Sequence, residues 1–211
     1  MEEKYVIVNI LTRDCINDDM YFTGTVNSFL ENTNFDEKIN IHVYHNGNYS
    51  SVISQTVNSF VEKHYDKALF SVRLGGENKG IEFGVDASNE WVGEYKYCLF
   101  TEGEWITITE NKNWLNESLK FMEDNQIDQL ILHPYDCDEK DIEKEENGYV
   151  FLKEFRHTNK PHIRKNSSFY DNKVFPLQEY DGKTKPLKSA WLKTETMIPC
   201  EDFLNRMNYK I

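Results

Sequence analysis

Apolar runs that suit buried strands alternate with runs at helical spacing through the first two-thirds of the chain. The strand-like runs occupy residues 5–11, 39–44, 68–74, 95–100 and 128–133, and the first of them is apolar on both faces. Such runs are typical of a parallel sheet covered by helices on both sides. The helical runs between them occupy residues 22–30, 52–65, 81–92 and 114–125. This alternation predicts an α/β fold with right-handed crossovers and an open, mostly parallel sheet.

The pattern changes after the fifth strand-like run. Residues 137–147 are a charge run, for which we expect a solvated loop or a short helix. Residues 149–155 and 173–177 resemble strands, and residues 200–207 resemble a short helix. We therefore expect a single domain over residues 1–211 with a smaller, mixed C-terminal part.

Charge and cysteine content narrow the range of partners. The formal net charge of −12 argues against a nucleic-acid partner and against an anionic membrane surface. No run of about 18 apolar residues is present, so we expect no membrane span. The four cysteines show neither a CxxC pair nor zinc-ligand spacing. Reduced thiols are typical of an intracellular protein, and we expect a cytoplasmic one.

Ligands in open α/β sheets bind beyond the carboxyl ends of the strands. The residues that follow the five strand-like runs are therefore the candidates for a site. They are residues 12–14, 45–48, 75–80, 101–105 and 133–138.

Several short motifs fall in the run from residue 76 to residue 106. Asn78-Lys79-Gly80 precedes a helix, Gly93-Glu94-Tyr95 opens the fourth strand, and Glu102-Gly103-Glu104 follows that strand. This order resembles the core of family-2-type glycosyltransferases with the GT-A fold, which have Asn-x-Gly, Gly-Glu-Tyr and an acidic Asp-x-Asp. The resemblance covers roughly residues 5–136. Three features depart from it: the acidic motif has two glutamates, the spacing from Gly93 to Glu102 is a residue or two longer than the commonest family pattern, and no acid follows the second strand.

The resemblance implies a Rossmann-like GT-A sandwich with helices on both faces of the sheet. Residues 1–106 would then hold the nucleotide-sugar, and residues 107–211 would hold the acceptor. The implied activity is transfer of a sugar from a nucleotide-diphosphate-sugar donor to a hydroxyl group of a glycan or protein, inverting and assisted by Mn²⁺ or Mg²⁺. The alternative is a catalytically inactive GT-A-like domain that binds a sugar or a partner.

The resemblance also implies roles for particular residues. Nine residues are expected to contact the nucleotide-sugar: Thr12, Arg13, His45, Asn46, Asn78, Gly80, Asp86, Thr101 and Glu102. From the residues alone, most of these also suit plain turns, helix caps or a solvated helix face.

The metal ligands and the catalytic carboxylate form a second set of expectations. Glu102 and Glu104 suit a hard divalent cation, with His162 as a third ligand or as part of a solvated loop. An inverting transfer needs a carboxylate that accepts the acceptor's proton. The candidates are Asp136 and Asp138 after the fifth strand and the Glu201-Asp202 pair, although an acidic pair at a helix start is also explained by the helix dipole.

Overall fold

The structure is a computed structural model. It describes residues 4–14, 18–48, 50–133, 138–155, 158, 160–171 and 187–207. Within these residues no helix is long and apolar enough to cross a membrane.

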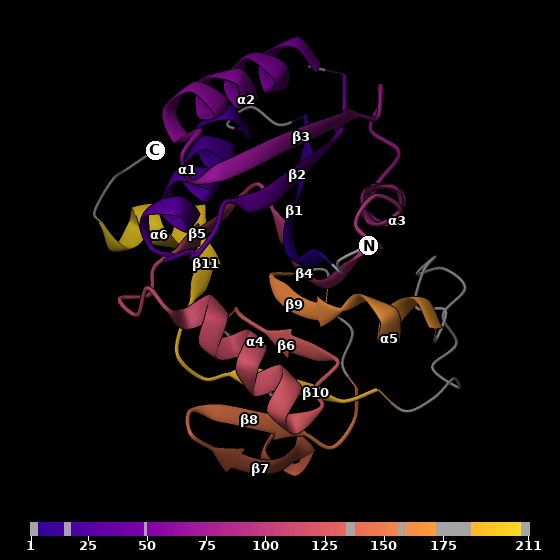
Figure 1. The fold of residues 1–211 in the computed structure, drawn as a ribbon, viewed down its shortest axis with the longest axis vertical. Helices are drawn as coiled ribbons and strands as arrows, with labels where there is room; N and C mark the ends of the chain where they lie inside the picture. Colours follow the sequence, from indigo (N-terminus) through magenta and orange to yellow (C-terminus); the bar gives the residue numbers. More distant parts are fainter. Residues whose placement is uncertain are drawn as a thin grey trace.

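One large mixed sheet runs through the molecule, as Figure 1 shows. Its strand order among the described residues is β3-β2-β1-β4-β9-β6-β10-β8-β7. The first four strands are parallel and are β1 (Lys4–Arg13), β2 (Ile39–Asn46), β3 (Ala68–Leu74) and β4 (Tyr95–Glu102). The predicted parallel α/β sheet is confirmed for this half of the molecule.

The other half of the sheet is mixed. Strand β9 (His162–Lys165) lies antiparallel between β4 and β6 (Gln129–Ile131). Beyond β6 lie β10 (Ser189–Leu192) and the hairpin of β7 (Ile142–Glu146) and β8 (Tyr149–Leu152). The resulting architecture is the expected one, with a parallel half and a smaller mixed part.

Two further strands form a small separate sheet. In it, β5 (Trp105–Thr107) pairs antiparallel with β11 (Met197–Pro199). The short helix α6 (Cys200–Arg206) follows β11 directly. A 3-10 turn, η1 (Glu139–Asp141), precedes β7.

Helices cover both faces of the large sheet. The first face carries α1 (Asp18–Glu31), α2 (Ser50–His64) and α4 (Trp114–Asn125). The second face carries α3 (Ile81–Asn89) and α5 (Asn166–Asp171).

Strand β1 shows why the sequence folds this way. Val8 and Ile10 point to the first face and belong to the main core, while Ile7 and Leu11 belong to the cluster under α3. All four are at least 94% buried, and each such side chain stabilises the fold by about 1.5–3 kcal/mol. An apolar strand of this kind is stable only between two layers of helices.

A buried polar cluster fastens α3 to the sheet. Arg164 of β9 is fully buried, and its guanidinium donates hydrogen bonds to Asn166 Oδ1 (3.1 Å) and to Asn89 Oδ1. Asn166 Nδ2 donates to the carbonyl oxygens of Val92 (2.7 Å) and Tyr95 (2.8 Å). These bonds fix the end of α3 and the turn that leads into β4.

Three sequence expectations differ from the structure. Residues 139–146 of the charge run form η1 and the exposed edge strand β7, because β8 supplies a pairing partner that a solvated loop would lack. The helix expected over residues 81–92 ends at Asn89, and the strand over residues 128–133 is limited to Gln129–Ile131. The strand expected over residues 173–177 lies outside the described residues.

The structure predicts a specific acid sensitivity. His42 of β2 is buried, hydrogen-bonded through Nδ1 to Ser71 Oγ (2.9 Å) and stacked on Trp91. Burial, and secondarily the charge of Arg73, lower the pKa of His42 from 6.5 to about 4. The unfolded chain therefore binds a proton at His42 that the folded protein resists, so stability is lost as pH falls from about 6.5 toward 4.

We expect His42→Gln to reduce the drop in melting temperature between pH 7 and pH 4.5 by about 4 °C. Thermal unfolding followed by circular dichroism measures this. The exposed Ser59→Ala variant is the control and should behave as the wild type. Equal acid sensitivity in His42→Gln and the wild type would contradict this prediction.

Candidate functional site

A cavity of about 300 Å³ opens at the carboxyl ends of β1, β2 and β4. Leu11 and Phe22 form part of its apolar wall. Several residues predicted from the sequence line it, and these are Thr12, Arg13, Asn46, Asn78, Gly80, Glu102 and Glu104. Residues from three strand ends and from the start of α3 thus share one concave surface, where open α/β sheets bind ligands.

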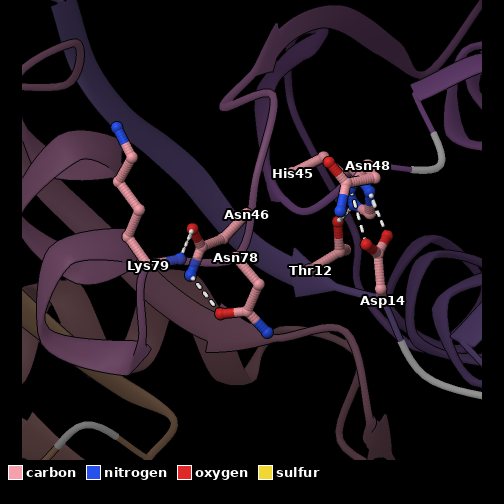
Figure 2. Close-up of polar contacts among 7 residues, drawn as sticks. All are labelled: Thr12, Asp14, His45, Asn46, Asn48, Asn78 and Lys79. Carbon is pink, nitrogen blue, oxygen red and sulfur yellow. Dashed lines mark hydrogen bonds and ion pairs between the residues drawn. The ribbon is translucent and has the colours of Figure 1, made fainter.

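The Asn46 side chain holds the loop that precedes α3 (Figure 2). Its Nδ2 donates to the carbonyl oxygen of Gly80 (2.8 Å) and to Asn78 Oδ1 (3.3 Å), and its Oδ1 accepts from the backbone N–H of Lys79 (3.3 Å). Gly80 has φ of +92°, a left-handed conformation that favours glycine. The Asn-x-Gly motif is therefore a fixed wall of the cavity, built around one amide.

A second polar chain joins the ends of β1 and β2 (Figure 2). Thr12 Oγ1 lies 2.9 Å from His45 Nδ1, and His45 Nε2 lies 3.0 Å from Asp14 Oδ1. The backbone N–H of Asn48 donates to Asp14 Oδ2 (2.6 Å). An ionised carboxylate only accepts, so the Nε2 of His45 carries the proton toward Asp14. With a neutral ring, Thr12 donates to Nδ1 and keeps its lone pairs for a ligand.

His45 was expected to touch the ligand, and the structure places it behind the cavity. Its side chain is 1% exposed and is not among the lining residues, whereas Thr12 is. Asp14, one of the residues 12–14 expected at the site from their place after the first strand, completes this chain of hydrogen bonds. The sequence signal for this contact was the missing acid after β2. A buried histidine at that position needs a hydrogen-bond partner, and without a nearby acid in its own loop the partner comes from the end of the neighbouring strand.

The two glutamates lie on either side of a tight turn. The backbone N–H of Gly103 donates to the carbonyl oxygen of Leu11 (2.8 Å). A Cβ at Gly103 would lie 2.9 Å from Thr12 Cγ2, so the turn fits closely against the end of β1. Arg13 Nη2 lies 3.7 Å from Glu104 Oε2.

Electrostatics distinguish Glu102 from an ordinary surface carboxylate. Burial raises its pKa above the usual value, and the negative charge of Glu104 raises it further. The Trp105 side chain and the charges of Arg13 and Lys160 act in the opposite direction. A cation between the two glutamates would relieve their repulsion.

The cavity offers two carboxylate side chains, which supply some of the ligands that a hard divalent cation needs. Carboxylate oxygens are the ligands that Mn²⁺ and Mg²⁺ prefer, and such ions keep waters and substrate phosphates as further ligands. The described residues contain no group of three or more His, Cys, Asp or Glu side chains arranged around a metal position. A cation here would therefore be held by Glu102, Glu104, waters and the phosphates of a molecule bound in the cavity.

The third expected metal ligand, His162, lies elsewhere. It sits in β9, its Nδ1 donates to the carbonyl oxygen of Lys160 (2.8 Å), and its ring packs on Phe100 and Phe169. It does not line the cavity of the glutamates. The expectation that it joins them is corrected here, because the antiparallel insertion of β9 buries it within the sheet.

Three further expected site residues, all of them described, do not line this cavity. Asp86 lines a different cavity between α3 and the end of β3. Thr101 is buried, and its hydroxyl donates to the carbonyl oxygen of Glu102 (3.1 Å). Asp202 is exposed in the first turn of α6, and Asp136 lies outside the described residues.

Comparison with known proteins gives a match in fold. No protein-family model matches the chain, and no curated protein matches its sequence. Residues 1–349 of S. aureus TarS match over 97% of this chain and 63% of that one, with 15% identity and a TM-score of 0.61. GalNAc-T7 with UDP, GalNAc and Mn²⁺ matches over 92% of this chain and 45% of its own, with 7% identity and a TM-score of 0.60.

A third solved structure has the same fold. UDP-glucose pyrophosphorylase complexed with UDP-glucose matches over 96% of this chain and 97% of that one, with 11% identity and a TM-score of 0.58. The chain has the GT-A-type fold of nucleotide-sugar glycosyltransferases, as its sequence predicts. It spans less than two thirds of the TarS fragment. The fold alone does not fix the reaction, since one fold hosts several chemistries.

The close fit of Gly103 against Thr12 gives a testable prediction. We expect Gly103→Ala to destabilise the protein by about 1–3 kcal/mol, because the new methyl group overlaps Thr12 Cγ2. Thr12→Ser removes that Cγ2 and keeps the hydroxyl that meets His45. The double variant should recover much of the loss.

A double-mutant cycle of denaturant unfolding measures this coupling. If the changes in unfolding free energy of the two single variants simply add in the double variant, the contact with Thr12 Cγ2 is not the cause of the destabilisation.

Proposed function

We propose that this protein is a glycosyltransferase that moves a sugar from a nucleotide-diphosphate-sugar to a hydroxyl group of a glycan or protein. The single observation that carries the proposal is the cavity that Glu102 and Glu104 line together with Thr12, Asn78 and Gly80. Its volume of about 300 Å³ is at the lower end of small-molecule sites. Solved structures of the TarS fragment with UDP-GlcNAc and with UDP support the class of donor.

The proposed metal is Mn²⁺ or Mg²⁺, held by Glu102 and Glu104. When bound, the cation supplies charge neutralisation for a diphosphate leaving group. The two carboxylates of this chain bind and orient it, and Gly103 lets the backbone approach the ligand closely. The match to GalNAc-T7, solved with Mn²⁺, supports a divalent ion.

The rest of the cavity suits a nucleotide. Arg13 is 59% exposed beside Glu104, so its guanidinium can turn to a phosphate. The first turn of α3 opens on the cavity through Gly80 and Ile81, and a helix N-terminus favours anions. Thr12 offers an acceptor for an N–H or O–H group of the nucleoside, and Leu11 gives an apolar surface.

The acceptor side is a further part of the proposal. We propose an inverting transfer in which residues 1–106 hold the donor and residues 107–211 contribute to the acceptor site. Asp202 and Asp136 stay the candidates for the carboxylate that accepts the acceptor's proton.

A sugar- or partner-binding domain without turnover is the second candidate. The observation that favours it is the Glu-Gly-Glu motif, together with the lack of a three-ligand group among the described side chains. Ligand binding would then survive chelation of metal, and no donor would be hydrolysed or transferred.

Calorimetry with UDP-, GDP- and dTDP-sugars tests the proposed function. We expect at least one donor to bind in the micromolar range with Mn²⁺ and at least about tenfold more weakly after chelation, a difference of about 1.4 kcal/mol. Release of nucleoside diphosphate distinguishes a glycosyltransferase from a pyrophosphorylase, which exchanges pyrophosphate. The absence of binding heat with every donor in the presence of Mn²⁺ would refute the proposal.

The raised pKa of Glu102 predicts how metal and pH act together. Ionised Glu102 is less favourable in the folded protein than in the unfolded chain, so the wild type without metal is stabilised at this site as pH falls. Mn²⁺ should raise the melting temperature at pH 7.5, and this gain should shrink as Glu102 binds a proton.

Glu102→Gln should lose most of the Mn²⁺ effect at every pH and melt about 2 °C higher than the wild type at pH 7.5 without metal. Differential scanning fluorimetry from pH 4.5 to pH 7.5 measures both effects. The exposed Glu110→Gln is the matched control. A Mn²⁺ effect of equal size in Glu102→Gln and the control would exclude this carboxylate as a ligand.

A further inference from the structure

Strand β3 is the outermost strand at one end of the large sheet, as Figure 1 shows. It runs for seven residues, from Ala68 to Leu74, and pairs in register with β2 along its whole length. Among the described residues, no strand pairs with its outer side. The outer row of backbone groups is thus a template for one more strand.

The hydrogen bonds at the two ends of β3 show which residues face outward. The carbonyl oxygen of Lys67 accepts from Ile39, and the N–H of Gly75 donates to His45. Both bonds point to β2, and alternate residues of a strand direct their backbone groups to the same side. The N–H and C=O groups that point away from β2 therefore belong to Ala68, Phe70, Val72 and Leu74.

The side chains do not protect this edge. Leu69, Val72 and Leu74 are 54%, 38% and 43% exposed. Natural edge strands commonly carry charges, prolines or bulges that prevent pairing. β3 has one charge, Arg73, which lies over the Trp91 ring and pairs with Glu90, and its ladder with β2 has no bulge.

We propose that β3 is a dimerisation edge, on which the β3 strands of two copies pair antiparallel about a two-fold axis at Ser71. In this register Ala68 lies opposite the partner's Leu74, and Phe70 lies opposite the partner's Val72. All four outward-facing residues then exchange both backbone hydrogen bonds. A register centred on Phe70 or on Val72 leaves residues at one end of β3 unpaired.

Pairing of the strand with a second copy of itself brings no like charges opposite each other, which favours a second copy over a foreign strand that carries charges. Arg73 falls opposite the partner's Leu69, so like charges do not face each other. No Asp or Glu lies in β3, although the whole chain has a net charge of −12. Two copies can therefore pair without carboxylates of β3 opposing each other, and Val72 and Leu74 gain apolar neighbours.

Sedimentation velocity of the full chain from about 1 to 100 µM tests the proposal. We expect a concentration-dependent dimer in the wild type and at least about tenfold weaker association in Val72→Lys, which places a charge in the paired edge. The control Met207→Lys adds the same charge at another exposed apolar position and should dimerise as the wild type. A wild type that is monomeric at all concentrations, or a Val72→Lys dimer of unchanged affinity, overturns the proposal.

A cysteine at the two-fold axis tests the register independently. Ser71 would form a pair without hydrogen bonds, with Cα atoms about 4.5 Å apart, which suits a disulfide. We expect Ser71→Cys to give covalent dimers on mild oxidation. Ser59→Cys, at an exposed position of α2, and the wild type should not do so. Equal crosslinking of the two variants overturns the register, and this result stands even if Val72→Lys fails to fold.

Discussion

The ladder of strand β1 with its two neighbours is the constraint on which the site depends. β1 pairs in parallel with β2 and β4, so that Thr12 lies beside His45 and Leu11 lies beside Glu102. Parallel pairing aligns the carboxyl ends of all three strands. One set of backbone hydrogen bonds therefore places the hydroxyl, the amide and the carboxylates of the cavity together.

Buried polar side chains then hold the loops that parallel strands leave unpaired. Asn46 ties the end of β2 to the Asn78–Gly80 loop, and the chain from Thr12 through His45 to Asp14 ties β1 to β2. Each of these groups is satisfied by a neighbour, which avoids the cost of an unpaired buried polar atom. The cavity is thus preorganised by its own walls, and a ligand meets fixed donors and acceptors.

The sequence was most informative for strands that are buried on both faces of the sheet. Strands apolar on both faces, such as β1, and the residues just after them could be predicted, because periodicity and topology fix their place. β9 could not, since the polar run His162–Lys165 becomes a strand only through pairing with β4 and β6 and through the bonds of Arg164. The contacts of Asp14 with His45 and of His162 with Phe100 could not be predicted for the same reason, because those residues are distant from each other in sequence.

The position of β9 has a consequence for biosynthesis. β4 is complete at Glu102, whereas β9, which covers its free side, ends at Lys165. While the ribosome adds the residues between β4 and β9, the sheet of β3, β2, β1 and β4 has an unpaired edge at β4, which later lies in the middle of the sheet. Unpaired edges invite association between chains, and incompletely folded chains that expose them are prone to aggregate. Slow or interrupted translation between these two strands should therefore prolong the exposure of the unpaired edge of β4.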